Sequence, residues 1–172
     1  IGSAAEYGAV KKDEIPVKET NPLRPINYYG ISKVAQTLLC RKFYIADGLK
    51  INVVRPFNLT GPGLPENLIC GSLANQIIRL KKSKLPNEIH VGNLRAWRDF
   101  VDVRDAVEAY WKIINYKYYG EIFNVGSGKS YSIEYVLKTF IEYSGLGKVR
   151  IIKDKTRIRN VEIQKQIADI SK

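Results

Sequence analysis

The stretch from Asn27 to Asp47 constrains the fold of this chain more than any other. Its apolar residues recur at steps of three and four, the period of an amphipathic helix: Val34, Leu38, Leu39 and Phe43. Gly48 follows as a typical helix stop, and Lys50–Arg55 then has the pattern of a short buried β-strand. A helix that leads through a glycine into a buried strand predicts an α/β fold.

Tyr29 and Lys33 lie four positions apart at the start of this helix. Side chains at that spacing share one helix face, so the phenol and the ammonium are expected to lie side by side. A positive charge beside a phenol favours its ionised form, which makes a tyrosine usable as a general acid or base near neutrality. Tyr7 and Lys11 repeat the spacing without helical periodicity, so the pair gains meaning only from the motifs around it.

Further motifs accompany this pair in a definite order along the chain. They are Gly2–Gly8, Val53–Gly63, Arg98–Asp105 and Asn124–Gly128. Together with Tyr29 and Lys33 they resemble the extended short-chain dehydrogenase/reductase family, whose members remodel nucleotide-sugars, and the resemblance covers nearly the whole chain. Within that family, Gly2–Gly8 and Val91–Leu94, with Arg98 close behind, are similar to the GDP-6-deoxy-D-mannose (GDP-4-keto-6-deoxy-mannose) reductases.

The resemblance implies the C-terminal part of a Rossmann-type doubly wound parallel sheet plus a small α/β substrate-binding domain. Residues 1–58 would be the remainder of the dinucleotide-binding domain, and residues 59–172 mainly the nucleotide-sugar domain, with about 99–125 returning to the Rossmann sheet. No Gly-x-Gly-x-x-Gly occurs, so the phosphate-cradling turn is expected upstream. We therefore expect a C-terminal portion of an enzyme subunit, with Ile1 as the last residue of a buried strand.

Periodicity and capping residues predict the other elements. Further helices are expected over Ser72–Lys82, from an Asp102 cap to about Asn115, and from a Ser132 cap to Gly145. Strands are expected at Ile89–Val91, with Trp97–Val101 as its neighbour, and at Glu121–Val125, and residues 10–27 are expected to form a surface loop. The inward face of the second of these helices is expected to comprise Ala106, Val107, Tyr110 and Ile114.

The resemblance also implies roles for individual residues. Ser3, Tyr29 and Lys33 would be catalytic, and NAD(P) would be held by Tyr29, Lys33, Pro56 and Phe57. The nucleotide-sugar would be bound by Asn58, Arg98, Arg159 and Glu162, although the usual Arg-Pro-x-Glu reads Arg159-Asn160-Val161-Glu162 here. Two simpler readings stay open: Ser3 could only cap a turn, and Arg98 could only pair with Asp99 or Asp102.

Residues after Ser3 bear on the choice of reaction. A 4,6-dehydratase of this family carries a carboxylate two positions after the hydroxyl residue, where this chain has Ala5. Glu6 is one residue further on and should point to the other face of an extended segment. We therefore expect NAD(P)H-dependent reduction of the 4-keto group of a GDP-4-keto-6-deoxy-hexose. A nucleotide-sugar 4-epimerase, a GDP-mannose 4,6-dehydratase-like enzyme and a non-catalytic fragment or binding module are the alternatives.

Composition limits the partners. Lys and Arg number 28 against 17 Asp and Glu, a formal net charge of +11, which suits an anionic substrate, an anionic surface or nucleic acid. No recognition-helix, zinc-ligand or aromatic-platform pattern accompanies the charge, and no apolar run is long enough to span a membrane. We expect no nucleic-acid, membrane or metal partner. Two cysteines, Cys40 and Cys70, indicate a reduced cytoplasmic setting, and the family implies a homodimer or higher homo-oligomer.

Overall fold

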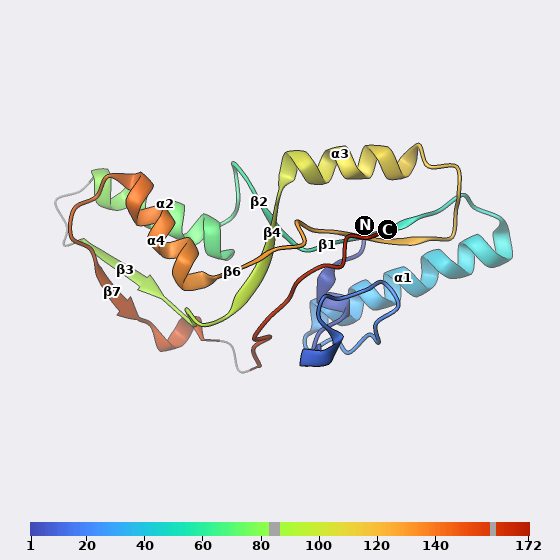
Figure 1. Ribbon diagram of the computed structural model, residues 1–172, viewed down its shortest axis with the longest axis horizontal. Helices are drawn as coiled ribbons and strands as arrows, with labels where there is room; N and C mark the ends of the chain where they lie inside the picture. The colour runs from blue at the N-terminus through green and yellow to red at the C-terminus, as the bar shows by residue number, and fades with distance from the viewer. Residues whose placement is uncertain (83–86, 159–160) are drawn as a thin grey trace. The chain divides into compact units, whose positions relative to one another are not determined.

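The computed structural model describes residues 1–82, 87–158 and 161–172, and it has a mixed α/β architecture with parallel strand pairs (Figure 1). The chain divides into two compact units. The first comprises residues 1–59, 98–130 and 165–172, and the second comprises residues 60–97 and 131–164. The chain changes unit within strands β2 (Asn58–Thr60), β4 (Trp97–Asp102) and β6 (Ser130–Ser132), which form a sheet in the order β2-β4-β6, and again between residues 164 and 165.

The first unit is built on a parallel pair of strands, of which the first is fully buried. β1 (Val53–Pro56) pairs with β5 (Ile122–Val125) so that Val53 lies opposite Ile122 and Pro56 opposite Val125. These are the strands expected from Lys50–Arg55 and Glu121–Val125, with later starts. Apolar side chains on one side pack with helix α3 (Val103–Ile114) in a core cluster of Val54, Val101, Ala106 and Val125.

Helix α1 (Tyr28–Asp47) has the bounds that its sequence predicts. Asn27 caps its start by accepting a hydrogen bond from Gly30 N at 2.8 Å, and Gly48 ends it with a left-handed φ of 66°. The apolar residues of α1 are not covered within this chain, because Leu38, Leu39 and Phe43 are 55%, 59% and 46% exposed. The buried residues of α1 are instead Gly30 and Thr37.

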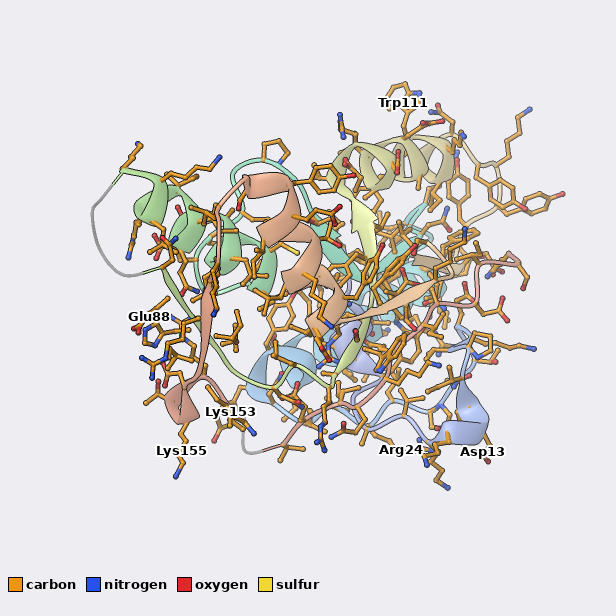
Figure 2. The ribbon with its side chains drawn as sticks, turned by 60° about the vertical axis from the view of Figure 1, so that its left-hand side comes forward. Asp13, Arg24, Glu88, Trp111, Lys153 and Lys155 are labelled. Carbon is orange, nitrogen blue, oxygen red and sulfur yellow. The ribbon has the colours of Figure 1, made fainter. Side chains whose placement is uncertain are left out.

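The predicted cap of α3 is confirmed, but part of its predicted inward face is wrong. Asp102 accepts from Arg104 N at 2.9 Å and the helix ends before Asn115. Val107 and Ile114 are 58% and 68% exposed. Trp111 of the same helix is 67% exposed, and Figure 2 shows it on the outer side of α3. Ala106 and Tyr110 pack into the core as predicted, and Ala109 and Ile113 complete this face in place of Val107 and Ile114.

The second unit packs two helices over another parallel strand pair. α2 (Ile69–Lys82) begins three residues earlier than expected, whereas α4 (Ile133–Ser144) lies between its predicted Ser132 and Gly145 caps. β3 (Glu88–Val91) pairs in parallel with β7 (Arg150–Lys153), so the expected neighbour of β3 at Trp97–Val101 is wrong. The core of this unit consists of Leu73, Ile77, Ile89, Val91 and Leu137.

Short 3₁₀ turns and loops complete the described chain: η1 (Ala4–Glu6), η2 (Lys12–Glu14) and η3 (Lys155–Arg157). The loop of residues 10–27 is not wholly superficial, because Val17 is fully buried with Ala4, Tyr7, Phe57 and Ala168. Ile1 is 65% exposed in this chain, and its place at the end of a buried strand stays a prediction. Among the described helices, none is both long and apolar enough to cross a bilayer.

Candidate functional site

The first turns of α1 present Tyr29 and Lys33 together. The Lys33 ammonium lies 5.8 Å from the centroid of the Tyr29 ring, and the Tyr29 side chain is 56% exposed. Lys33 Nζ donates to the Ile1 carbonyl at 3.0 Å and to Gln36 Oε1 at 2.9 Å. A fixed ammonium beside an accessible phenol is the arrangement that a tyrosine acid needs.

The loop that carries Ser3 packs closely against this end of α1. Ser3 caps η1: its Oγ accepts from Ala5 N at 3.1 Å, and its own N–H donates to Glu6 Oε1 at 2.9 Å. Gly30 lies so near the loop that an added Cβ would be 2.6 Å from the Ala5 carbonyl oxygen. The turn-capping role of Ser3 is therefore present, and the same packing brings its loop to the helix turn that holds Tyr29.

The end of β1 adds three of the predicted residues. Pro56 is buried, and Phe57 is 6% exposed with its ring 6.4 Å from that of Tyr7. Asn58 is half-buried and donates from Nδ2 to the Asp99 carbonyl at 2.9 Å. This position beyond the carboxyl end of a parallel strand is where ligands bind in open α/β sheets.

The other residues predicted to bind the nucleotide-sugar belong to both units. Arg98 is half-buried in β4 of the first unit, and Glu162 is half-buried in the second. Arg159, with Asn160, lies outside the described residues. Asp99 and Asp102 have partners of their own, because Asp99 accepts from Ser127, Gly128 and Ala168, whereas Asp102 pairs with Arg104 at 2.7 Å.

A buried polar network behind the Ser3 loop was not predicted. Glu6 is fully buried and pairs with Arg55, which is 2% exposed, at 2.9 Å between Nε and Oε2. Glu6 Oε2 also accepts from Thr37 Oγ1 of α1 at 2.9 Å. An arginine within an otherwise apolar strand is a usable sequence signal, because a buried guanidinium requires a carboxylate partner.

The network continues to Tyr7 and Asn124. Arg55 NH1 donates to Tyr7 OH at 3.1 Å, and this hydroxyl donates to Asn124 Oδ1 at 2.6 Å. Burial raises the pKa of the Tyr7 phenol to about 12, against an opposing effect of Arg55. Tyr7, which has a lysine four residues later as Tyr29 does, is thus buried and hydrogen-bonded, whereas Tyr29 is exposed.

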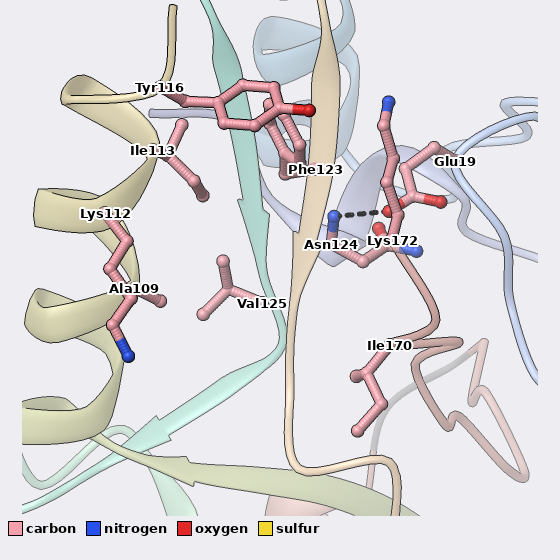
Figure 3. A pocket seen from close by; sticks show the side chains of 10 residues that line it. All are labelled: Glu19, Ala109, Lys112, Ile113, Tyr116, Phe123, Asn124, Val125, Ile170 and Lys172. Carbon is pink, nitrogen blue, oxygen red and sulfur yellow. Dashed lines mark hydrogen bonds between the residues drawn. The ribbon is translucent and has the colours of Figure 1, made fainter.

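A pocket of about 490 Å³ lies between α3, β5 and the end of the chain (Figure 3). On the α3 side Ala109 and Ile113 line it together with Lys112, and on the other side the Asn124 backbone N–H donates to Glu19 Oε1 at 2.8 Å. None of the residues predicted for catalysis or binding lines it. The lining residues are Glu19, Ala109, Lys112, Ile113, Tyr116, Phe123, Asn124, Val125, Ile170 and Lys172.

The residues on α1 fit a dinucleotide cofactor chemically. An ammonium has three N–H donors, and in the part of the chain that the structure describes Lys33 Nζ donates to two neutral oxygens. It can therefore still donate to a ribose hydroxyl, beside a phenol that is accessible to a ligand. Within the described ranges no group of three or more His, Cys, Asp or Glu side chains could hold a metal.

Known proteins resemble this chain along its whole length. A sequence model of the family described as GDP-mannose 4,6 dehydratase matches residues 1–172. GDP-6-deoxy-D-mannose reductase of Pseudomonas aeruginosa is 33% identical over 94% of this chain and 53% of its own length. GDP-6-deoxy-D-talose 4-dehydrogenase of Aggregatibacter actinomycetemcomitans is 28% identical over 100% and 55%.

A solved structure supports the same relationship. The structure described as RMD from Pseudomonas aeruginosa complexed with NADPH superposes with a TM-score of 0.90 at 30% identity, over 98% of this chain and 55% of that one. The chain thus spans about half the length of the proteins that it matches. It belongs to the GDP-mannose 4,6 dehydratase family of extended short-chain dehydrogenases/reductases.

Proposed function

We propose that this chain carries the catalytic residues of an NAD(P)H-dependent reductase that acts on the 4-keto group of a GDP-4-keto-6-deoxy-hexose. The observation that carries the proposal is the packing of α1 on the Ser3 loop, with Tyr29 and Lys33 side by side at the accessible end of the helix. The names of the two relatives, a reductase and a 4-dehydrogenase of GDP-6-deoxy-sugars, support this substrate class.

When bound, NAD(P)H would be the source of the hydride for the sugar carbonyl carbon. Ser3 donates a hydrogen bond to the carbonyl oxygen and orients it, and Tyr29 delivers the proton to that oxygen. Lys33 holds a ribose hydroxyl of the cofactor and stabilises the tyrosinate left after proton transfer. Pro56 and Phe57 would border the nicotinamide.

We assign the first unit to the dinucleotide-binding part and most of the second to nucleotide-sugar binding. Arg98 and Arg159 would contact the diphosphate, since a guanidinium makes bidentate, charge-assisted bonds to phosphate oxygens. Asn58 would reach the diphosphate as well. Glu162 would accept from ribose hydroxyls. The exposed apolar side of α1 supports a homodimer or higher homo-oligomer, and a cytoplasmic location stays a prediction.

Glu6 argues against a dehydratase. Removal of water from the sugar needs an additional acid and base beside the hydroxyl residue, and the position two residues after Ser3 holds Ala5. The carboxylate of Glu6 is fully buried and already accepts from Ser3 N, Thr37 and Arg55. It is therefore not available to a sugar.

Ligand binding and product analysis on the full-length gene product test the proposal. A ligand that binds only the folded state raises its thermal stability, so GDP should raise the Tm and UDP should not. With NAD(P)H and a GDP-4-keto-6-deoxy-hexose, cofactor oxidation should match alcohol formation one to one. Preference for UDP, with interconversion of 4-epimers in the absence of added reductant, would replace the reductase by a 4-epimerase.

A further inference from the structure

We propose that Glu6 is a positioning residue, which sets the place of Ser3 relative to Tyr29 by joining three segments of the first unit through one buried carboxylate. The inference rests on the proposed function for the roles of Ser3 and Tyr29. The contacts of Glu6 are observed in the structure and do not depend on that function.

Each oxygen of Glu6 has a separate task. Oε1 accepts from the backbone N–H of Ser3 at 2.9 Å, whereas Oε2 accepts from Thr37 Oγ1 and Arg55 Nε, both at 2.9 Å. Ser3 lies on the loop that carries the hydroxyl, Thr37 is on α1 with Tyr29, and Arg55 is on β1. One side chain therefore connects the elements that carry the proposed catalytic groups.

The surroundings keep the carboxylate in this place. Arg55 is held by a second set of contacts, with Tyr7 OH at 3.1 Å, the Tyr7 ring at 4.8 Å and the Glu19 carbonyl at 3.3 Å. Gly2 makes room for Glu6, because a Cβ at this position would lie 2.3 Å from Oε1. Arg55 and Gly2 thus keep Oε1 directed at the Ser3 amide.

A purely stabilising role explains this arrangement poorly. A buried ion pair is a weak source of stability, because the desolvation of both charges opposes their attraction, and apolar replacements of equal volume often do as well. One carboxylate oxygen of Glu6 binds the Ser3 backbone amide, and the other binds Thr37 and Arg55. Hydrogen bonds fix the direction of these contacts, and apolar packing would not. Geometry of this kind matters for catalysis, since small misplacements of reacting groups cost rate.

Glu6→Gln tests the inference, and the chain offers a matched control. Glu14 likewise accepts from a backbone N–H three residues earlier, that of Lys11 at 2.9 Å, and pairs with Arg24 at 2.7 Å. It lies on a partly exposed loop outside the proposed triad. Glu6→Gln keeps volume but turns one acceptor into a donor, so either Ser3 N or Arg55 loses its partner, and Glu14→Gln makes the same change elsewhere.

In the full-length gene product, Glu6→Gln should lower kcat about 10- to 100-fold and leave KM for the nucleotide-sugar within about 3-fold. In a Ser3→Ala background the same substitution should lower kcat less than about 3-fold, because residues that act through one another are not additive. Glu14→Gln should leave both constants unchanged. Equal losses of kcat in the two backgrounds would overturn the positioning role.

Amide hydrogen exchange provides a readout that does not depend on turnover. Glu6→Gln should speed exchange at residues 2–8 and 28–33 together, whereas Glu14→Gln should affect residues 11–24 only. Unchanged exchange at residues 28–33 would refute the link between Glu6 and α1, whether or not the wild type is active. If the wild type is inactive but exchange rises in both segments, only the proposed function is refuted. If Glu6→Gln does not fold, Gly2→Ala, which displaces Oε1 and keeps the charge, undergoes the same tests with the same criteria.

Discussion

Replacement of Asp99 by asparagine should destabilise the first unit far more than the same replacement three residues later. Asp99 is fully buried, and its two oxygens accept four hydrogen bonds. Oδ1 accepts from Ser127 N at 2.8 Å and Ser127 Oγ at 2.7 Å, and Oδ2 from Gly128 N at 3.1 Å and Ala168 N at 3.0 Å. The side chain thereby holds the turn after β5 and the last segment of the chain.

The magnitude follows from the donors that an amide cannot satisfy. In its better orientation the asparagine directs its NH₂ group at Ser127, whose hydroxyl can rotate to accept, and only one backbone N–H loses its acceptor. An unsatisfied buried donor costs about 1–3 kcal/mol, and the remaining bonds lose their charge assistance, so we expect a total of about 2–4 kcal/mol. For a chain of this size that corresponds to a Tm lower by roughly 5–15 °C.

Asp102→Asn is the matched control within the same motif. Asparagine caps helices as well as aspartate does, and the Arg104 partner of Asp102 is 82% exposed, so its loss should cost less than about 1 kcal/mol. Urea unfolding of the two variants, followed by circular dichroism at 222 nm, measures the difference. Equal urea midpoints for the two variants would show that Asp99 does not hold these segments.

Three further predictions concern stability. Gly30→Ala should destabilise the chain by about 1–3 kcal/mol despite the better helix propensity of alanine, because its Cβ would meet a backbone oxygen at 2.6 Å; Gly147→Ala, with open space around it, should be neutral in the same urea assay. Burial raises the Tyr7 pKa to about 12, so the folded state holds the phenol proton more tightly than the unfolded state does. The free energy of unfolding should therefore fall by about 2–3 kcal/mol as the pH rises from 10 to 12. A Tyr7→Phe variant whose stability falls equally with pH would contradict this. Arg24 lowers the pKa of Glu14 to about 2, so this pair should stabilise the fold above pH 4.5 and lose its effect as the pH falls to 2; Glu14→Gln should flatten that part of a pH titration of Tm, and an unchanged profile would count against the pair.

The helices were predictable from sequence because their ends are marked by local chemistry. Asn27 and Gly48 bound α1, and Ser132 and Gly145 bound α4, since a capping side chain and a left-handed glycine act within a few residues. β2, β6 and β7 were missed, because three or four residues are too few to show a period by themselves. The equally short β1 could be predicted because Ile51, Val53 and Val54 form a β-branched run.

Long-range partners were the other limit. Glu6 and Arg55 are 49 positions apart, and no local pattern pairs them. Val107 and Ile114 of α3 were assigned inward because periodicity shows that a helix has an apolar face, and it does not show which parts of that face another element covers. Tyr29, Lys33 and Ser3 could be proposed from ordered motifs, whereas the close approach through Gly30 needed the fold.

Turnover by Tyr29→Phe in the full-length gene product tests the central claim most directly. Tyr28, its neighbour in sequence, is 90% exposed, so Tyr28→Phe is a control for the loss of one hydroxyl on the same helix turn. With NAD(P)H and GDP-4-keto-6-deoxy-mannose, followed by cofactor absorbance at 340 nm, Tyr29→Phe should lower kcat by about 10²–10⁴-fold, the usual contribution of a general acid. Tyr28→Phe should retain full activity. Undiminished turnover by Tyr29→Phe would contradict the proposed proton transfer.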